Sequence, residues 1–261
     1  MATNMKKTAF LAIVLAMLMP LCGYYIVKFY SKDAVHIPPH YFYDEVVETA
    51  GGKAKTDTVW HQVKGIPFIN QLGQKVSIDD LRGKIIVLDF FFSRCPTICP
   101  GLARNMKKLQ DSFKSNDSIV QFISVSIDPE NDSVPRLRKY ADRFNVNHDT
   151  WWFVTGDKKQ IYDFAIKEIK ANVADPGVDT AFIHTENFFL LDSNHIIRGF
   201  YNGFDTVRLA QLARDIPTLM LERDKKSPSI FREFIPILPL IFLGIGFVIF
   251  ITALLNKKRQ Y

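Results

Sequence analysis

Two cysteines in this sequence, Cys95 and Cys99, stand close enough together to act as one chemical unit. They lie between a long apolar run and a segment whose apolar residues have helical spacing. If a helix begins here, residues i and i+4 share one face about 6 Å apart, which suits a disulfide or two thiolates on one soft metal ion. Unpaired N–H groups at a helix N-terminus also lower a thiol pKa. The pair therefore predicts disulfide chemistry, metal binding or both.

The third cysteine and the histidines are weaker candidates. Cys22 lies inside an apolar run, where a packed or lipid-facing side chain is expected. Because two thiolates alone leave a metal site open, a histidine ligand is sought, and His184 is favoured by its place just before an apolar strand-like run. The alternatives in the body are His61, His148, His195 and the carboxylate of Glu186. The remaining histidines, His36 and His40, are expected to be solvated.

The elements that must position these residues alternate between strands and helices. Residues 84–92 and 119–127 are nearly continuous apolar runs, as in strands buried on both faces of a sheet. Residues 102–113 and 134–144 have helical spacing. Further expected elements are a hairpin at 68–76, a helical turn at 77–81, a strand at 150–154, a helix at 158–170, a hairpin at 188–201 and a helix at 206–221 kinked or broken at Pro217. This order predicts an α/β, thioredoxin-like fold.

Two uncharged runs flank this body, at residues 8–27 and 234–255. Either run is long enough to cross a hydrocarbon core of about 30 Å as a helix, so we expect two transmembrane helices. A cleaved signal peptide or a lipoprotein signal at Cys22 is disfavoured for the first run by the residues around it. Basic residues at both chain ends place both ends in the cytoplasm.

The predicted organisation follows from these runs. It comprises a cytoplasmic tail at 1–7, a transmembrane helix at 8–27, a linker at 28–59, a thioredoxin-like domain at 60–222, a linker at 223–233, a transmembrane helix at 234–255 and a tail at 256–261. Residues 31–60 show no clear periodicity and are expected to be irregular. The soluble domain is expected on the periplasmic side of a bacterial inner membrane.

The charge distribution excludes a nucleic-acid partner. The chain has 33 Lys and Arg against 27 Asp and Glu, a formal net charge of +6. Five of the basic residues belong to the two ends, so the body itself is nearly neutral. A DNA- or RNA-binding domain would carry its positive excess on the folded body.

Three segments together resemble a known family. The sequence from Cys95 to Pro100 (CPTICP) follows a strand end of sequence FFFS, and Phe122–Pro129 (FISVSIDP) and His184-Thr185 follow downstream. This order resembles the Sco/SenC family of membrane-anchored, thioredoxin-like copper proteins over roughly residues 60 to 215. Family members usually have one N-terminal anchor, so the second apolar run departs from the pattern.

The resemblance implies a site and a function. It implies that Cys95, Cys99 and His184 bind a copper ion, as Cu(I) or Cu(II), that the cysteines form a redox-active disulfide, and that Asp128 supports the site or docks a partner. The expected function is a membrane-anchored copper metallochaperone that assists assembly of the copper centre of cytochrome c oxidase. Its expected partners are the copper-bearing oxidase subunit, other copper chaperones, thiol reductants and the membrane.

Two other functions remain as alternatives. One is a thiol–disulfide oxidoreductase that reduces the cysteines of the oxidase copper site. The other is a peroxidase of the peroxiredoxin type, which is disfavoured because no threonine stands three residues before either cysteine.

Overall fold

The computed structural model describes residues 18–19, 22–26, 29, 37–49, 55–171 and 186–222. The predicted tails, the second apolar run and most of the first lie outside these residues. Among the described residues, no helix combines the length and hydropathy that crossing a membrane requires. The chain divides into two units, Met1–Leu221 and Glu222–Tyr261, and the folded body belongs to the first.

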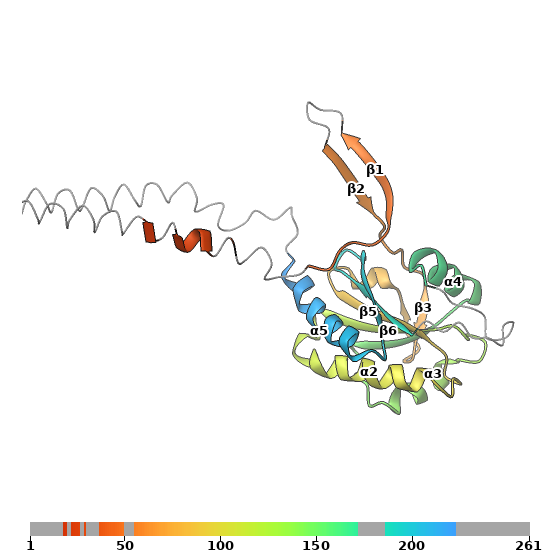
Figure 1. The fold of residues 1–261 in the computed structure, drawn as a ribbon. Coiled ribbons are helices and arrows are strands. Elements are labelled where there is room, and N and C mark those ends of the chain that lie inside the picture. The colour runs from red at the N-terminus through yellow and green to blue at the C-terminus, as the bar shows by residue number, and fades with distance from the viewer. Residues whose placement is uncertain are drawn as a thin grey trace, which may run out of the picture. The chain divides into compact units, whose positions relative to one another are not determined.

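A seven-stranded sheet forms the centre of this body (Figure 1), in the order β4-β3-β7-β6-β5-β8-β9. Three central strands, β7, β6 and β5, are parallel, and β3 and β8 pair with them antiparallel. At the two edges, β4 pairs antiparallel with β3 and β9 with β8. The strands are β3 (Phe68–Asn70), β4 (Lys75–Val76), β5 (Ile85–Phe91), β6 (Val120–Ser126), β7 (Trp151–Thr155), β8 (Asn187–Leu191) and β9 (Ile197–Asn202). The predicted α/β class and the predicted strands of the body are confirmed.

Two of the three parallel strands, β5 and β6, are buried along their whole length. Strand β5 pairs in register with β6 from Ile85 opposite Val120 to Phe91 opposite Ser126. Since carboxyl ends of neighbouring parallel strands meet at one edge of a sheet, the loops after β5 and β6 lie together.

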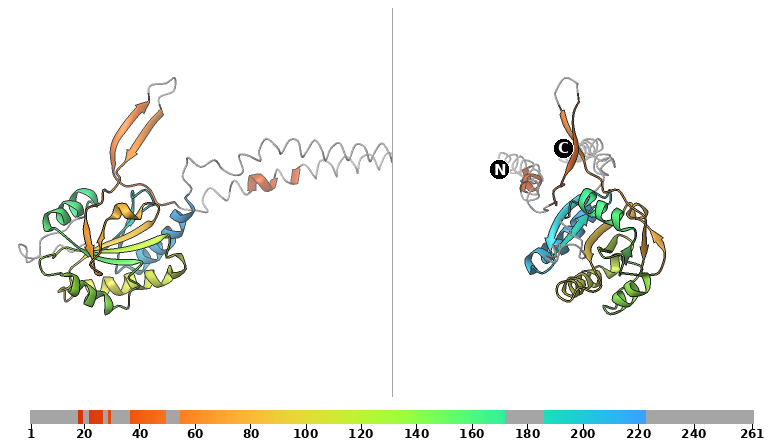
Figure 2. Two further views of the ribbon diagram at one scale, coloured as in Figure 1. Left: turned by 180° about the vertical axis from the view of Figure 1, so that it is seen from behind. Right: turned by 90° about the vertical axis from the view of Figure 1, so that its right-hand side faces the viewer.

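Helices cover both faces of the sheet. Figures 1 and 2 show α2, α3 and α5 on one face and α4 on the other. The helices are α2 (Cys99–Ser112), α3 (Val134–Asp142), α4 (Lys158–Asp163) and α5 (Thr206–Leu221), with 3-10 turns at Ile78–Leu81 and Lys114–Asn116. Helix α4 continues as a π-helical turn, Phe164–Glu168. Helix α5 runs through Pro217 as one helix, so a break there, one of the two predicted outcomes, does not occur.

The expectation of an irregular segment at 31–60 is wrong for its second half. Strands β1 (Tyr43–Thr49) and β2 (Lys55–Trp60) form an antiparallel hairpin that is separate from the main sheet (Figure 1). Tyr43, Val46 and Val59 are exposed there, so these apolar positions do not mark the buried face on which a prediction from hydrophobic alternation relies. His40 is also not simply solvated, because its ring stacks on Trp60 at 4.9 Å.

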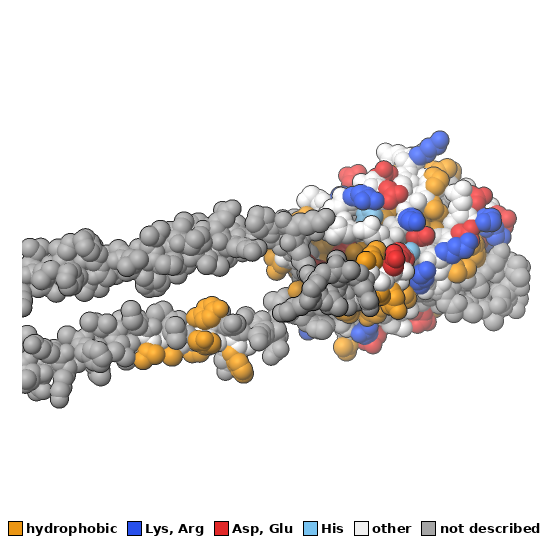
Figure 3. All heavy atoms as spheres, turned by 90° about the horizontal axis from the view of Figure 1, so that it is seen from above, with side chains coloured by type: hydrophobic (Ala, Val, Ile, Leu, Met, Phe, Trp, Pro, Cys, Tyr) orange, Lys and Arg blue, Asp and Glu red, His pale blue; other side chains and the backbone are white. Residues whose placement is uncertain are grey.

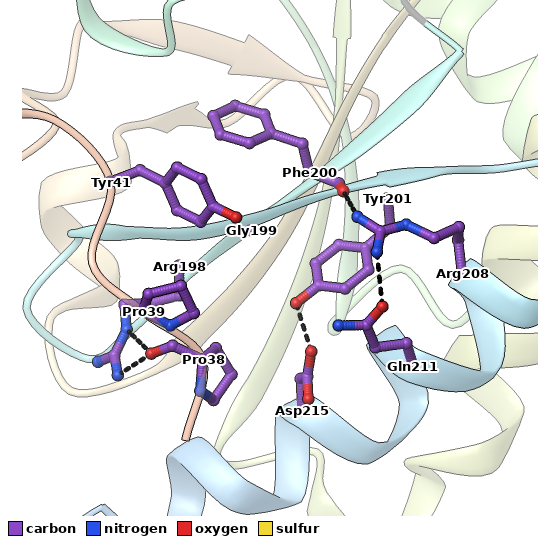
Figure 4. A pocket seen from close by; sticks show the side chains of 10 residues that line it. All are labelled: Pro38, Pro39, Tyr41, Arg198, Gly199, Phe200, Tyr201, Arg208, Gln211 and Asp215. Atoms are coloured by element: carbon purple, nitrogen blue, oxygen red, sulfur yellow. Dashed lines mark hydrogen bonds between the residues drawn. The ribbon is translucent and has the colours of Figure 1, made fainter. Parts of the chain in front are cut away.

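The segment before this hairpin is bound to the body. The buried guanidinium of Arg198 on β9 donates to the Pro38 carbonyl at 3.0 and 2.6 Å (Figure 4) and pairs with Asp192 at 2.9 Å. The Tyr41 N–H donates to the Ile197 carbonyl. Residues 38–41 are therefore part of the folded body and not of a free linker.

Candidate functional site

Both cysteines of the pair lie at the junction between β5 and α2. Cys95 lies in the loop after β5, where its N–H donates to the Phe92 carbonyl at 3.2 Å, and Cys99 is the first residue of α2. Both are free thiols and are only 4% and 2% exposed. The predicted strand–helix junction is confirmed.

The two thiols have opposite protonation preferences. The Cys99 N–H donates to Cys95 Sγ at 3.4 Å, and Thr97 Oγ1 lies 3.8 Å from the same sulfur. Hydrogen bonding from the Cys99 side chain, against the opposing effect of burial, lowers the pKa of Cys95 to about 4. The same side-chain hydrogen bond, together with burial, raises the pKa of Cys99. Of the two thiols, Cys95 therefore ionises more readily, and the Cys99 thiol stabilises its thiolate.

A buried carboxyl group lies near this pair. Asp89 is on β5, and burial raises its pKa to about 7 although a hydrogen bond from Ser124 opposes the shift. Among the described residues, Asp89 Oδ1 and the Tyr140 hydroxyl are buried without a hydrogen-bond partner. The negative charge of Asp89 also contributes to the raised pKa of Cys99. Asp89 was not singled out from the sequence. The signal that could have found it is the single carboxylate within the otherwise apolar run at 84–92.

Asp128 contacts the cysteine loop through an arginine. It follows β6, and its Oδ2 accepts two hydrogen bonds from the Arg94 guanidinium at 2.7 and 3.1 Å. Its Oδ1 accepts one from the Asn131 amide at 2.8 Å. Arg94 immediately precedes Cys95, so the structure brings Asp128 to the loop that carries the first thiol.

The histidine candidates divide between described and undescribed residues. His184 lies outside the described residues, so its place in the site stays a prediction. His61 pairs with Asp44 at 2.8 Å, His148 pairs with Asp142 at 3.1 Å, and His195 is buried in the turn between β8 and β9, where burial lowers its pKa. Within the described ranges no group of three or more His, Cys, Asp or Glu side chains could hold a metal ion. Among the described residues, none of the alternative histidines therefore forms such a group with the two sulfurs.

A cavity of about 150 Å³ opens elsewhere on the body, between residues 38–41, β9 and α5 (Figure 4). Its lining includes Arg208, Gln211 and Asp215 but none of the candidate ligands. The cysteine pair is therefore the candidate site.

Comparisons with known proteins agree with this fold and this motif. A family model described as SCO1/SenC matches residues 61–221. The SCO1 protein homolog of Bacillus subtilis (strain 168) is 34% identical over 167 residues, which cover 64% of this chain and 86% of that protein.

Solved structures of Sco proteins superpose on the body. A SCO1/SenC family lipoprotein from Bacillus anthracis str. Ames has a TM-score of 0.56 and 31% identity, covering 62% of this chain and 95% of that one. BsSco, a Sco family cytochrome c oxidase assembly protein with a disulfide switch, has a TM-score of 0.56 and 34% identity, covering 64% and 98%. Copper-bound ScoI from Bradyrhizobium japonicum shares the fold, with a TM-score of 0.50 and 22% identity, covering 59% and 98%. By its family match and its fold, this chain belongs to the SCO1/SenC family.

Proposed function

We propose that this chain is a membrane-anchored copper metallochaperone that assists assembly of the copper centre of cytochrome c oxidase. The observation that carries the proposal is the buried thiol pair of Cys95 and Cys99 at the start of α2, in a chain of this family. Cu(I) prefers soft thiolate ligands and accepts a low coordination number, so the donor set fits copper as a cargo. The copper-bearing oxidase subunit is the expected recipient.

His184 is the proposed third ligand, and the position of Glu186 supports this. The Glu186 carbonyl accepts a hydrogen bond from the Gly203 N–H at 2.7 Å. A Cβ added at Gly203 would lie 2.3 Å from Leu102 Cδ2, so Gly203 packs directly on the first turn of α2, which begins at Cys99. Residues 184 and 186 are separated by two peptide units, which span at most about 7 Å. This tether favours His184 over histidines that have partners elsewhere.

Thiol–disulfide exchange is the second candidate function, and the opposed thiol pKa values favour it. A thiolate at Cys95 can attack a partner disulfide, and Cys99 can then resolve the mixed disulfide. In the balanced reaction the partner disulfide becomes two thiols, while Cys95 and Cys99 become a disulfide. Electrons pass from this chain to its partner, which would prepare reduced cysteines at a copper site.

The substitution His184→Ala separates the two candidates. We expect Cu(II) affinity to fall on the order of 100-fold, because Cu(II) prefers nitrogen and more ligands, whereas Cu(I) stays bound between two sulfurs. The Cys95–Cys99 disulfide should still form, and oxidase assembly should be impaired. The measurements are Cu(II) absorption of the reconstituted full chain and oxidase activity in cells that carry the variant.

The matched control is His148→Ala, since His148 contacts Asp142 and Gln71 and should leave copper binding unchanged. Unchanged Cu(II) binding in His184→Ala would remove His184 from the site. Lost Cu(II) binding with normal oxidase assembly would favour the oxidoreductase.

We further propose that residues 28–233 face the periplasm of a bacterial inner membrane, with both tails in the cytoplasm. The two uncharged runs with basic outer ends support this topology. A reporter active only in the cytoplasm should give a signal when fused after Tyr261. The same reporter inserted near Asn116 should stay silent, and a signal there would contradict the topology.

Surface charge supports a protein partner and not a nucleic acid. On the face shown in Figure 3, acidic and basic side chains are interspersed over the body. Nucleic-acid binding relies on a concentrated positive surface. Other copper chaperones or thiol reductants are the expected suppliers of copper or electrons.

A further inference from the structure

A second aspartate in the loop after β6 forms a hydrogen bond to the backbone of the cysteine loop, whereas Asp128 binds only a side chain of that loop. Asp132 is 0% exposed. Its Oδ2 accepts hydrogen bonds from the Ser93 N–H at 3.0 Å and from the Ser126 hydroxyl at 2.6 Å, and its Oδ1 accepts one from the Ser93 hydroxyl. One buried carboxylate thereby joins the end of β6 to the loop that follows β5.

The bond to the Ser93 N–H reaches Cys95 through a single peptide unit. The Ser93 N–H and the Phe92 carbonyl are the two ends of one planar peptide group. Asp132 holds the N–H end, and the carbonyl end accepts the Cys95 N–H at 3.2 Å. Turning this peptide plane would redirect the carbonyl and release the backbone of Cys95.

Asp132 differs in this respect from its neighbour Asp128. Asp128 binds the Arg94 side chain, which is 54% exposed, and ion pairs in contact with solvent contribute little. Asp132 accepts from three donors, two on the half-buried Ser93 and one on the buried Ser126, and leaving a buried donor without an acceptor is costly.

We infer that Asp132 is a positioning residue: it fixes the peptide unit between Phe92 and Ser93 and thereby holds Cys95 in the arrangement that stabilises the reduced thiol pair. This role rests on the proposed function, because it concerns the same two thiols. It acts through geometry and requires an acceptor at this position, not a negative charge.

Two substitutions of Asp132 separate geometry from charge. In Asp132→Asn the amide oxygen can accept from the Ser93 N–H and the Ser126 hydroxyl, while the amide NH₂ donates to a rotated Ser93 hydroxyl. In Asp132→Ala all three bonds are lost. The full chain in detergent is equilibrated without copper against reduced and oxidised glutathione. In this reaction the Cys95–Cys99 disulfide and two glutathione thiols become two protein thiols and one glutathione disulfide.

The expected result is selective. Asp132→Ala should lower the equilibrium constant for reduction at least tenfold, which is about 30 mV for this two-electron couple. Asp132→Asn should stay within about twofold of the unsubstituted chain, because it restores the acceptor. If Asp132→Ala does not fold, Asp132→Ser takes its place, since its shorter side chain withdraws the acceptor from the Ser93 N–H.

The matched control for lost stability is Asp215→Ala. Asp215 on α5 is also buried and accepts a hydrogen bond from the Tyr201 hydroxyl at 2.6 Å (Figure 4). Its removal deletes a buried hydrogen bond that does not involve the cysteine loop. The glutathione equilibrium should therefore stay unchanged.

An unchanged equilibrium in Asp132→Ala, or a shift in Asp132→Asn as large as in Asp132→Ala, overturns the positioning role. Either outcome leaves copper binding to be judged separately, because no copper is present. Conversely, a chain that binds no copper would refute the metallochaperone proposal and leave this measurement valid.

Discussion

Replacing Cys95 or Cys99 with serine is expected to abolish copper binding and the internal disulfide together. A serine hydroxyl is a hard, un-ionised ligand, so each variant keeps one thiolate where Cu(I) needs two. We expect Cu(I) affinity to fall on the order of 1,000-fold or more. The measurements are copper per chain after anaerobic competition with a chromophoric Cu(I) chelator, and thiol counts after mild oxidation.

The same substitution at Cys22 is the matched control. Cys22 is a free, exposed thiol, and the proposed ligand set does not include it. Cys22→Ser should therefore bind copper and form the disulfide as the unsubstituted chain does. If it lowers copper occupancy as much as Cys95→Ser does, the ligand assignment is wrong.

The strand–helix junction that holds the two thiols was predictable because the strands and the helix around it have clear hydrophobic patterns. The runs at 84–92 and 119–127 differ by one residue at each end from β5 and β6, since strands buried on both faces leave an unbroken apolar run. The helix predicted over 102–113 begins three residues earlier, at Cys99. Pro100 fits the first turn of a helix, so this earlier start agrees with the sequence.

Contacts that depend on tertiary structure were not predictable. In the hairpin of β1 and β2 the apolar side chains of Tyr43, Val46 and Val59 are exposed, so they do not mark a buried face for a sequence pattern to detect. Asp132 is one of several polar residues after β6, and only the meeting of two strand ends gives it Ser93 as a partner. The link from Asp128 to Arg94 likewise crosses from one loop to another. His184 lies outside the described residues, so its role stays a prediction.

Replacing Asp89 with asparagine is expected to stabilise the folded body at pH 8 by up to about 4 kcal/mol. The folded-state pKa of Asp89 is raised from 3.8 to about 7. Between these two pH values the folded state therefore holds a proton that the unfolded state releases, so stability falls as pH rises from about 4 to about 7 and stays low above that. An asparagine of the same shape removes this dependence.

The measurement compares thermal unfolding of the full chain in detergent at pH 4.5 and pH 8, with and without the substitution. The gain from Asp89→Asn should be largest at pH 8 and fall to about 1 kcal/mol at pH 4.5, where Asp89 is neutral in the folded state and only the unfolded state has begun to ionise. Asp163→Asn is the control of opposite sign, since hydrogen bonds from Lys159 and Lys167 lower the pKa of that exposed carboxyl to about 2. It should bring no gain at pH 8. Equal gains from Asp89→Asn at both pH values would mean that improved packing, and not the removal of a buried charge near the thiol pair, stabilises the variant.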